Sequence, residues 1–121
     1  MRQNLLKSIL ILLVIALGYG ETIGQVTTSS IQGQVVDAQG EALPGANIVA
    51  LHEPSGTRYG AVSNLDGRFN IANMRIGGPY TVTISFIGYQ NSTYSGIVLS
   101  LGTPYLVNTK LNDDSTELGE V

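Results

Sequence analysis

Few side chains in this sequence have the chemistry of a catalytic group or a metal ligand. His52 is the only histidine and the chain has no cysteine, whereas a structural zinc site needs four ligands drawn mainly from these two residue types. A serine hydrolase requires a Ser-His-Asp arrangement, but the nucleophile-elbow pattern GxSxG is missing. His52 stands beside Glu53 and Pro54, so we interpret it as a histidine of a surface loop. We therefore expect no enzyme activity, no metal and no cofactor.

Three acidic residues could form a carboxylate pair or a calcium site: Asp37, Glu41 and Asp66. All three lie at predicted turns, where Asp is favoured because its side chain accepts hydrogen bonds from nearby backbone N–H groups. The sequence around Asp66 also lacks the rest of an EF-hand loop. We interpret these residues as turn residues.

Five tyrosines could instead stack on a sugar ring. They are spread over five segments of the chain, at Tyr59, Tyr80, Tyr89, Tyr94 and Tyr105. Tyr80 and Tyr105 fall on predicted inward faces, which favours core packing over a binding platform. A carbohydrate-binding module remains the alternative, and two or three coplanar tyrosines on one open face would support it.

The composition limits the size and the class of the protein. The chain has 121 residues, a length that allows one domain. Its net charge is −3 and 12% of its residues are charged. This acidic balance argues against a nucleic-acid-binding surface, which needs clustered Lys and Arg.

Residues 1–24 have the order of a secretory signal peptide. Two basic residues precede the unbroken apolar run 9–17, and small or polar residues follow it, as in export signals. The run is about half the length that spans a bilayer. We predict cleavage before Gln25, with an uncleaved anchor as the alternative, and a short linker at 25–29.

The remaining chain is predicted to form short strands and turns. In the clearest strand, Tyr80, Val82, Ile84 and Phe86 alternate with polar residues, which is the period of a half-buried strand. We predict that Val82, Ile84 and Phe86 form the centre of the core, so that Phe86→Ala would cost about 3–5 kcal/mol. The predicted strands are 31–37, 46–51, 58–63, 68–72, 79–86, 90–94, 96–99 and 105–111. With no helical pattern between them, they predict an all-β sandwich.

Alternation also assigns faces in the first and the last of these strands. In the first, Ile31, Gly33 and Val35 share one face while Gln32 and Gln34 share the other. In the last, the residues expected to point inward are Tyr105, Val107 and Leu111.

The order of the motifs resembles a known family. The motifs are Ile31-x-Gly33-x-Val35-x-Asp37-x-x-Gly40, then Leu43-Pro44-Gly45-Ala46-Asn47-Ile48, then Asn64-x-Asp66-Gly67-x-Phe69-x-Ile71, then the run from Gly77 to Tyr89. This series closely resembles the carboxypeptidase-regulatory-like domain, which is also classed with carbohydrate-binding-like folds. It is most similar to the copy at the N-terminus of Oar-like TonB-dependent outer-membrane receptors. The resemblance implies a seven- or eight-stranded prealbumin-like, Greek-key β-sandwich over residues 30–111.

The same resemblance implies a location and partners. The domain would be a non-catalytic accessory domain on the periplasmic side of the outer membrane of a Gram-negative bacterium. In such receptors a plug and a barrel follow it, so we expect this chain to be a fragment, with a stand-alone domain as the alternative. The acidic tail 112–121 is expected to be mobile and to lie apart from the sandwich. Its end is similar to the start of a TonB-box region, so the residues expected to bind the TonB energy-transducing system are Glu117, Leu118, Gly119, Glu120 and Val121.

Overall fold

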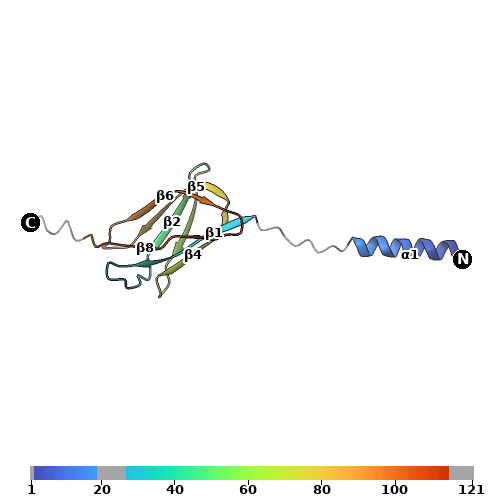
Figure 1. Cartoon of the computed structure of the whole chain (residues 1–121), viewed down its shortest axis with the longest axis horizontal. Helices are drawn as coiled ribbons and strands as arrows, with labels where there is room; N and C mark the ends of the chain where they lie inside the picture. The colour runs from blue at the N-terminus through green and yellow to red at the C-terminus, as the bar shows by residue number, and fades with distance from the viewer. Residues whose placement is uncertain (1, 19–26, 115–121) are drawn as a thin grey trace, which may run out of the picture.

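The computed structural model describes residues 2–18 and 27–114 (Figure 1). The helix α1 (Arg2–Leu17) contains the apolar run of the predicted signal peptide, and none of its residues is buried. Within the two described ranges, every helix falls short of the length and apolarity that a membrane crossing demands. The predicted cleavage position before Gln25 lies outside the described residues, so export stays a prediction.

Within the described residues, eight strands form two sheets. The two sheets pack face to face (Figure 1). In the first sheet, β4 pairs with β1 antiparallel, and β7 and β8 lie one after the other along the opposite side of β1 in parallel orientation. The second sheet has the order β3-β2-β5-β6 and is antiparallel throughout. The strands are β1 (Thr28–Val36), β2 (Asn47–His52), β3 (Thr57–Val62), β4 (Arg68–Arg75), β5 (Gly77–Ser85), β6 (Ser92–Leu99), β7 (Tyr105–Leu106) and β8 (Thr109–Lys110). The predicted all-β sandwich is confirmed.

The alternation of β5 places its apolar side chains in the core. Tyr80, Val82 and Ile84 are each 0% exposed, as the period of two predicts. Phe86 is only partly buried, so its predicted place at the centre of the core is wrong. The strand ends at Ser85, and the Tyr89 N–H donates to the carbonyl of Phe86 at 3.1 Å, which puts Phe86 in a turn at the rim.

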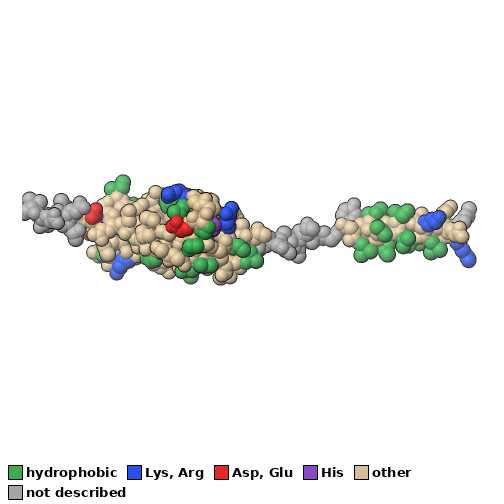
Figure 2. Space-filling model, turned by 90° about the horizontal axis from the view of Figure 1, so that it is seen from above, with side chains coloured by type: hydrophobic (Ala, Val, Ile, Leu, Met, Phe, Trp, Pro, Cys, Tyr) green, Lys and Arg blue, Asp and Glu red, His purple; other side chains and the backbone are tan. Residues whose placement is uncertain are grey.

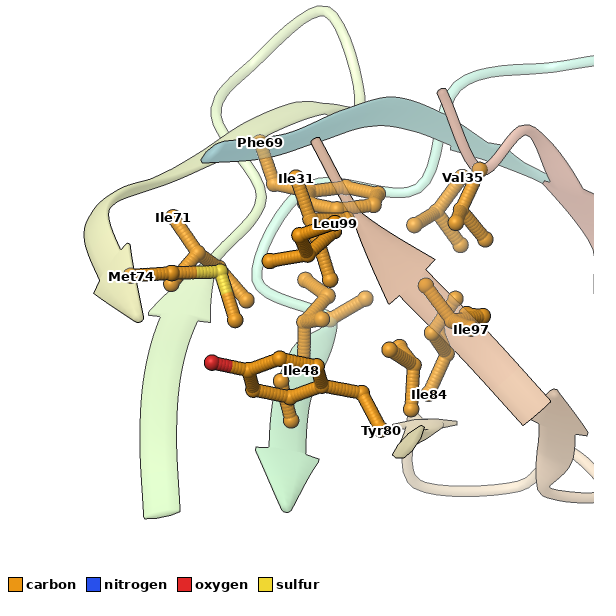
Figure 3. Close-up of a cluster of buried hydrophobic side chains, with 14 of the residues drawn as sticks. Ile31, Val35, Ile48, Phe69, Ile71, Met74, Tyr80, Ile84, Ile97 and Leu99 are labelled. Carbon is orange, nitrogen blue, oxygen red and sulfur yellow. The ribbon is translucent and has the colours of Figure 1, made fainter. Parts of the chain in front are cut away.

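The core is filled by large side chains from both sheets (Figure 3). The first sheet contributes the labelled residues Ile31, Val35, Phe69, Ile71 and Met74, and the second contributes Ile48, Tyr80, Ile84, Ile97 and Leu99. Burying each such side chain contributes roughly 1.5–3 kcal/mol to folding. This core holds the outer face of each sheet in place.

Several predicted boundaries differ from the structure. The predicted strands 68–72 and 79–86 left a gap between them, but β4 runs to Arg75 and β5 starts at Gly77. Ile76 alone links them as the chain crosses between the sheets. The predicted strands 90–94 and 96–99 are the single strand β6. Gly96 adopts a φ of +72° at a shift in the β5–β6 register, so it bends the strand at a bulge instead of ending it.

The predicted strand 105–111 is divided into β7 and β8 where the chain passes Gly33. The Val107 N–H donates to the carbonyl of Gln32 at 2.8 Å, and the Val107 carbonyl occupies the space that a Cβ on Gly33 would need. Val107 and Leu111 are buried as predicted, whereas Tyr105 is 40% exposed. The inward placement of Tyr105 is wrong because β7 is a two-residue edge strand without a neighbour on its outer side.

The chain enters and leaves the sandwich at opposite ends (Figure 1). At one end the carbonyl of Thr28 accepts a hydrogen bond from Gly102. At the other, the Gln90 N–H donates to Asn112 at 2.8 Å and the Asp114 N–H donates to Gly88 at 3.0 Å. The expectation that the tail lies apart from the sandwich is therefore wrong for residues 112–114, and residues 115–121 lie outside the described residues.

Candidate functional site

A groove of about 720 Å³ lies over β1, β4 and β7 of the first sheet and reaches Val62 at the end of β3 in the second sheet. We call it the amide groove, because five of its residues carry side-chain amides. Its lining is Gln32, Gly33, Gln34, Val62, Asn64, Arg68, Phe69, Asn70, Leu106 and Asn108. No acidic residue lines it, so the groove offers amide groups, one guanidinium and two exposed aliphatic side chains.

Strand register brings these side chains together. Gln32 on β1 lies opposite Asn70 on β4 and opposite Leu106 on β7. Gln34 on β1 lies opposite Arg68. Because side chains two residues apart on a strand share a face, the polar face of β1 and its neighbours on both sides form one continuous surface.

Part of this surface is held rigidly by hydrogen bonds. The Asn64 Oδ1 atom accepts from the N–H groups of Asp66 and Arg68, each at 3.0 Å. The Gln34 amide donates through Nε2 to the carbonyl of Asp66 at 2.9 Å, and the Gln34 N–H donates to the Oδ1 of Asn108 at 3.0 Å. Asn108, which lies between β7 and β8, thereby supplies the acceptor where their pairing with β1 is interrupted.

Three polar side chains of the groove are available to a ligand. Within residues 2–18 and 27–114, the side chains of Gln32, Asn70 and Arg68 have no hydrogen-bond partner. Asn70 and Arg68 are exposed and Gln32 is half-buried. Each amide can donate and accept, and the guanidinium is a fixed fork of donors. This set can recognise a ligand by hydrogen bonds and charge.

His52 lies elsewhere, and its predicted position in a surface loop is wrong. It is the last residue of β2 and is only 6% exposed. Its Nδ1 contacts the Oγ of Ser55 at 2.6 Å, and its ring packs on Tyr80 with the centroids 5.0 Å apart. The adjacent Glu53 accepts a hydrogen bond from Thr81. The second sheet continues one residue further than the sequence indicated, which gives the histidine a packing role.

Four of the five tyrosines considered above, all but Tyr105, lie in the core or pack against it. Tyr80 is fully buried, and its hydroxyl donates to the carbonyl of Arg75 at 2.5 Å. The Tyr59 ring lies 6.1 Å from that of Tyr80 at an angle of 54°, so the two are not coplanar. Tyr89 packs on Phe86, and Tyr94 hydrogen-bonds to Thr109 at 2.7 Å. Tyr59 and Tyr80 therefore do not form the coplanar pair on an open face that would favour a carbohydrate-binding module.

We expect the buried Tyr80 to make stability depend on alkaline pH. Burial raises the pKa of its phenol from 10.0 to about 12, and the nearby Tyr59 adds to the increase. An unfolded chain releases this proton near pH 10, whereas the folded chain retains it to about pH 12. The stabilisation that this pKa difference provides is therefore fully present below pH 10 and is lost as the pH rises from about 10 to about 12. Guanidinium unfolding of wild type and Tyr80→Phe across this range should show a steeper loss in wild type, and parallel losses would contradict the assignment.

Asp37 acts as a turn residue, as predicted, and Asp66 lies in a turn whose side-chain acceptor is Asn64. The Asp37 carboxylate accepts from the N–H groups of Gln39 and Glu41, each at 2.9 Å. Within the described ranges, no group of three or more His, Cys, Asp or Glu residues could hold a metal ion. Figure 2 shows charged side chains scattered over the sandwich, without a broad patch of one sign in that view.

The binding residues that the sequence predicts do not belong to the amide groove. Glu117, Leu118, Gly119, Glu120 and Val121 lie outside the described residues, so their role stays a prediction. The groove itself was not predicted. The sequence feature that could have indicated it is the pair Gln32 and Gln34 on the outer face of β1. This pair indicates a groove only when the residues opposite it on β4 and β7 are known.

Comparison with known proteins places this sandwich in a family. The family model described as carboxypeptidase regulatory-like domain matches residues 30–112. No curated protein matches the chain.

Solved structures share the fold at low sequence identity. The Bacillus anthracis TIE protein is 20% identical with a TM-score of 0.60, over 72% of this chain and 17% of that one. Hydroxyquinol 1,2-dioxygenase from Pseudomonas putida DLL-E4 is 11% identical with a TM-score of 0.59, over 76% of this chain and 58% of that one. 3-Chlorocatechol 1,2-dioxygenase from Rhodococcus opacus 1CP is 11% identical with a TM-score of 0.57, over 77% and 62%. The chain thus spans less than two thirds of each of these proteins, and the likeness concerns the fold alone.

Proposed function

The chain belongs to the carboxypeptidase regulatory-like domain family, and on this premise we propose that it is a non-catalytic accessory domain that contacts another protein through the amide groove. The composition of the groove carries the proposal. Its available groups are amides, a guanidinium and exposed aliphatic side chains, which bind partners by hydrogen bonds, charge and contact area. The rigid framework of Asn64, Gln34 and Asn108 keeps these groups in place without a ligand.

We place this domain at the periplasmic face of the outer membrane, as part of a TonB-dependent receptor. Two features support the placement: the signal-like order of the first 24 residues, and the resemblance of the motif series to the N-terminal domain of such receptors. The chain enters and leaves at opposite ends of the sandwich, which suits a domain set in line between a leader and a following domain. The plug and barrel are the proposed partners, with Glu117–Val121 as a proposed contact for the energy-transducing system.

Site-specific photocrosslinking in the source bacterium tests the protein contact. A photoreactive amino acid is placed at Asn70, in the groove, or at Thr83, on the outer face of the second sheet. We expect the Asn70 position to crosslink to the plug or barrel of an outer-membrane receptor, identified by mass spectrometry of the linked peptides, and the Thr83 position to give little of this product. Equal yields at the two positions, or crosslinks to cytoplasmic proteins alone, would refute the proposal.

Export is tested on the same material by N-terminal sequencing. We expect the protein in the periplasmic fraction to begin at or near Gln25, because small residues precede it in the pattern of a cleavage site. An intact Met1 on protein recovered from the cytoplasm would contradict export.

A further inference from the structure

We propose that the amide groove binds an extended acidic peptide segment of the partner, with a carboxylate side chain on Arg68 and the peptide main chain on Gln32 and Asn70. The inference rests on the proposed function in protein contact and specifies the chemistry of the partner.

The first argument is the row of side chains that crosses the sheet. Asn70, Gln32 and Leu106 are neighbours in register on three adjacent strands, and adjacent strands are about 4.8 Å apart. The two available amides therefore stand about one strand spacing apart on an open face. Each offers a donor and an acceptor, which matches the alternating N–H and C=O groups of an extended peptide.

The second argument is charge. Arg68 is exposed, sits beside the neutral Gln34, and forms no ion pair among the described residues. The lining contains no carboxylate, although the whole chain is acidic with a net charge of −3. The complement of a guanidinium framed by amides is a carboxylate, which it can bind through two parallel hydrogen bonds.

The third argument separates a peptide from a sugar. Leu106 is 67% exposed and Val62 is 62% exposed, and both line the groove. They can cover apolar side chains that flank the acidic residue. Sugar sites commonly present an open aromatic face, whereas the ring that lines this groove, Phe69, is 5% exposed.

The test is binding of the purified full chain to an array of blocked nonapeptides. The central residue is Glu, Gln or Lys, and the neighbouring positions are randomised. We expect the Glu-centred pool to yield ligands that bind at least about 10-fold more tightly than their Gln-centred counterparts, the effect of one charge-assisted hydrogen-bond pair. Arg68→Gln should abolish this preference. Arg58→Gln is the matched control, because Arg58 is also an exposed arginine on an edge strand but belongs to the second sheet.

Two further variants test the amides. Gln32→Ala and Asn70→Ala should each weaken the selected peptides severalfold, while thermal melting shows that the fold persists. In NMR spectra of the isotope-labelled protein, adding the selected peptide should shift the backbone amide resonances of Gln32 and Asn70 and leave that of Thr83 unchanged.

Several results would overturn the inference. They are equal binding of the three peptide pools, equal losses in Arg68→Gln and Arg58→Gln, or binding of an oligosaccharide array that depends on Gln32 and Asn70. If crosslinking at Asn70 captures a receptor while the peptide pools bind equally, the protein contact stands and the acidic peptide is wrong. If crosslinking captures no envelope protein, the proposed function itself fails.

Discussion

Gly33→Ala should destabilise the domain by about 3 kcal/mol or more, which is severe for overpacking at a single position. A Cβ at Gly33 would clash with the carbonyl oxygen of Val107 and would lie 2.9 Å from the Cζ atom of Phe69. Val107 cannot move aside easily, because its N–H donates to Gln32 and the next residue, Asn108, accepts from Gln34. Relief of the clash therefore requires detaching β7 and β8 from β1.

The matched control is Gly60→Ala. Gly60 also lies within a strand, but a Cβ there would meet only the carbonyl of Ile48, at 3.6 Å, which is ordinary contact. Alanine restricts the unfolded chain more than glycine does, so the change should stay within about 1 kcal/mol. Urea unfolding of the three proteins measures the difference. Similar midpoints for Gly33→Ala and Gly60→Ala would show that the crossing over Gly33 is not as tight as described.

Tyr80→Ala should cost about 3–5 kcal/mol, as for other large-to-small changes in a core. The side chain is 0% exposed, its ring contacts those of His52 and Tyr59, and its hydroxyl satisfies the carbonyl of Arg75. The substitution therefore leaves a cavity and a carbonyl without its partner. A domain of this size has roughly 5–10 kcal/mol of stability in total, so much of it would be lost.

Phe86→Ala serves as the comparison, because the sequence pattern assigned this residue to the centre of the core. Phe86 is partly buried in a turn and packs on Tyr89 at a centroid distance of 5.6 Å. We expect a cost of about 1–2 kcal/mol, below the range for a fully buried phenylalanine. Denaturant unfolding of both variants ranks them, and a larger loss for Phe86→Ala would place the core nearer the end of β5 than the structure does.

The sequence alone predicts the local features of the fold. The alternation of Tyr80, Val82 and Ile84 identified β5 and its buried face, and the turn residues Asp37 and Asn64 hold the turns that their side-chain chemistry favours. These features depend on neighbours within a few residues, so a period of two and a turn signal suffice to find them. The order of such motifs was also enough to indicate the family that the family model identifies.

The sequence could not predict how far a residue on an inward face is covered. Alternation says which way a side chain points, but coverage depends on the length of the opposing sheet. Phe86 and Tyr105 both follow the inward pattern and lie at the rim. His52 has the flanking residues of a loop and is buried, because β2 continues beside β5 far enough to pair His52 with Tyr80.

The amide groove was decided by tertiary structure alone. Its available residues come from Gln32 on β1 and from Arg68 and Asn70 on β4, and its edge from Leu106 on β7. The antiparallel register of β1 with β4 and the parallel register of β1 with β7 bring them together. A period-two pattern predicts that a residue points outward, but it does not predict which residue of the neighbouring strand lies opposite. Only long-range pairing, set by packing across the core and by the passage of Val107 over Gly33, selects those neighbours.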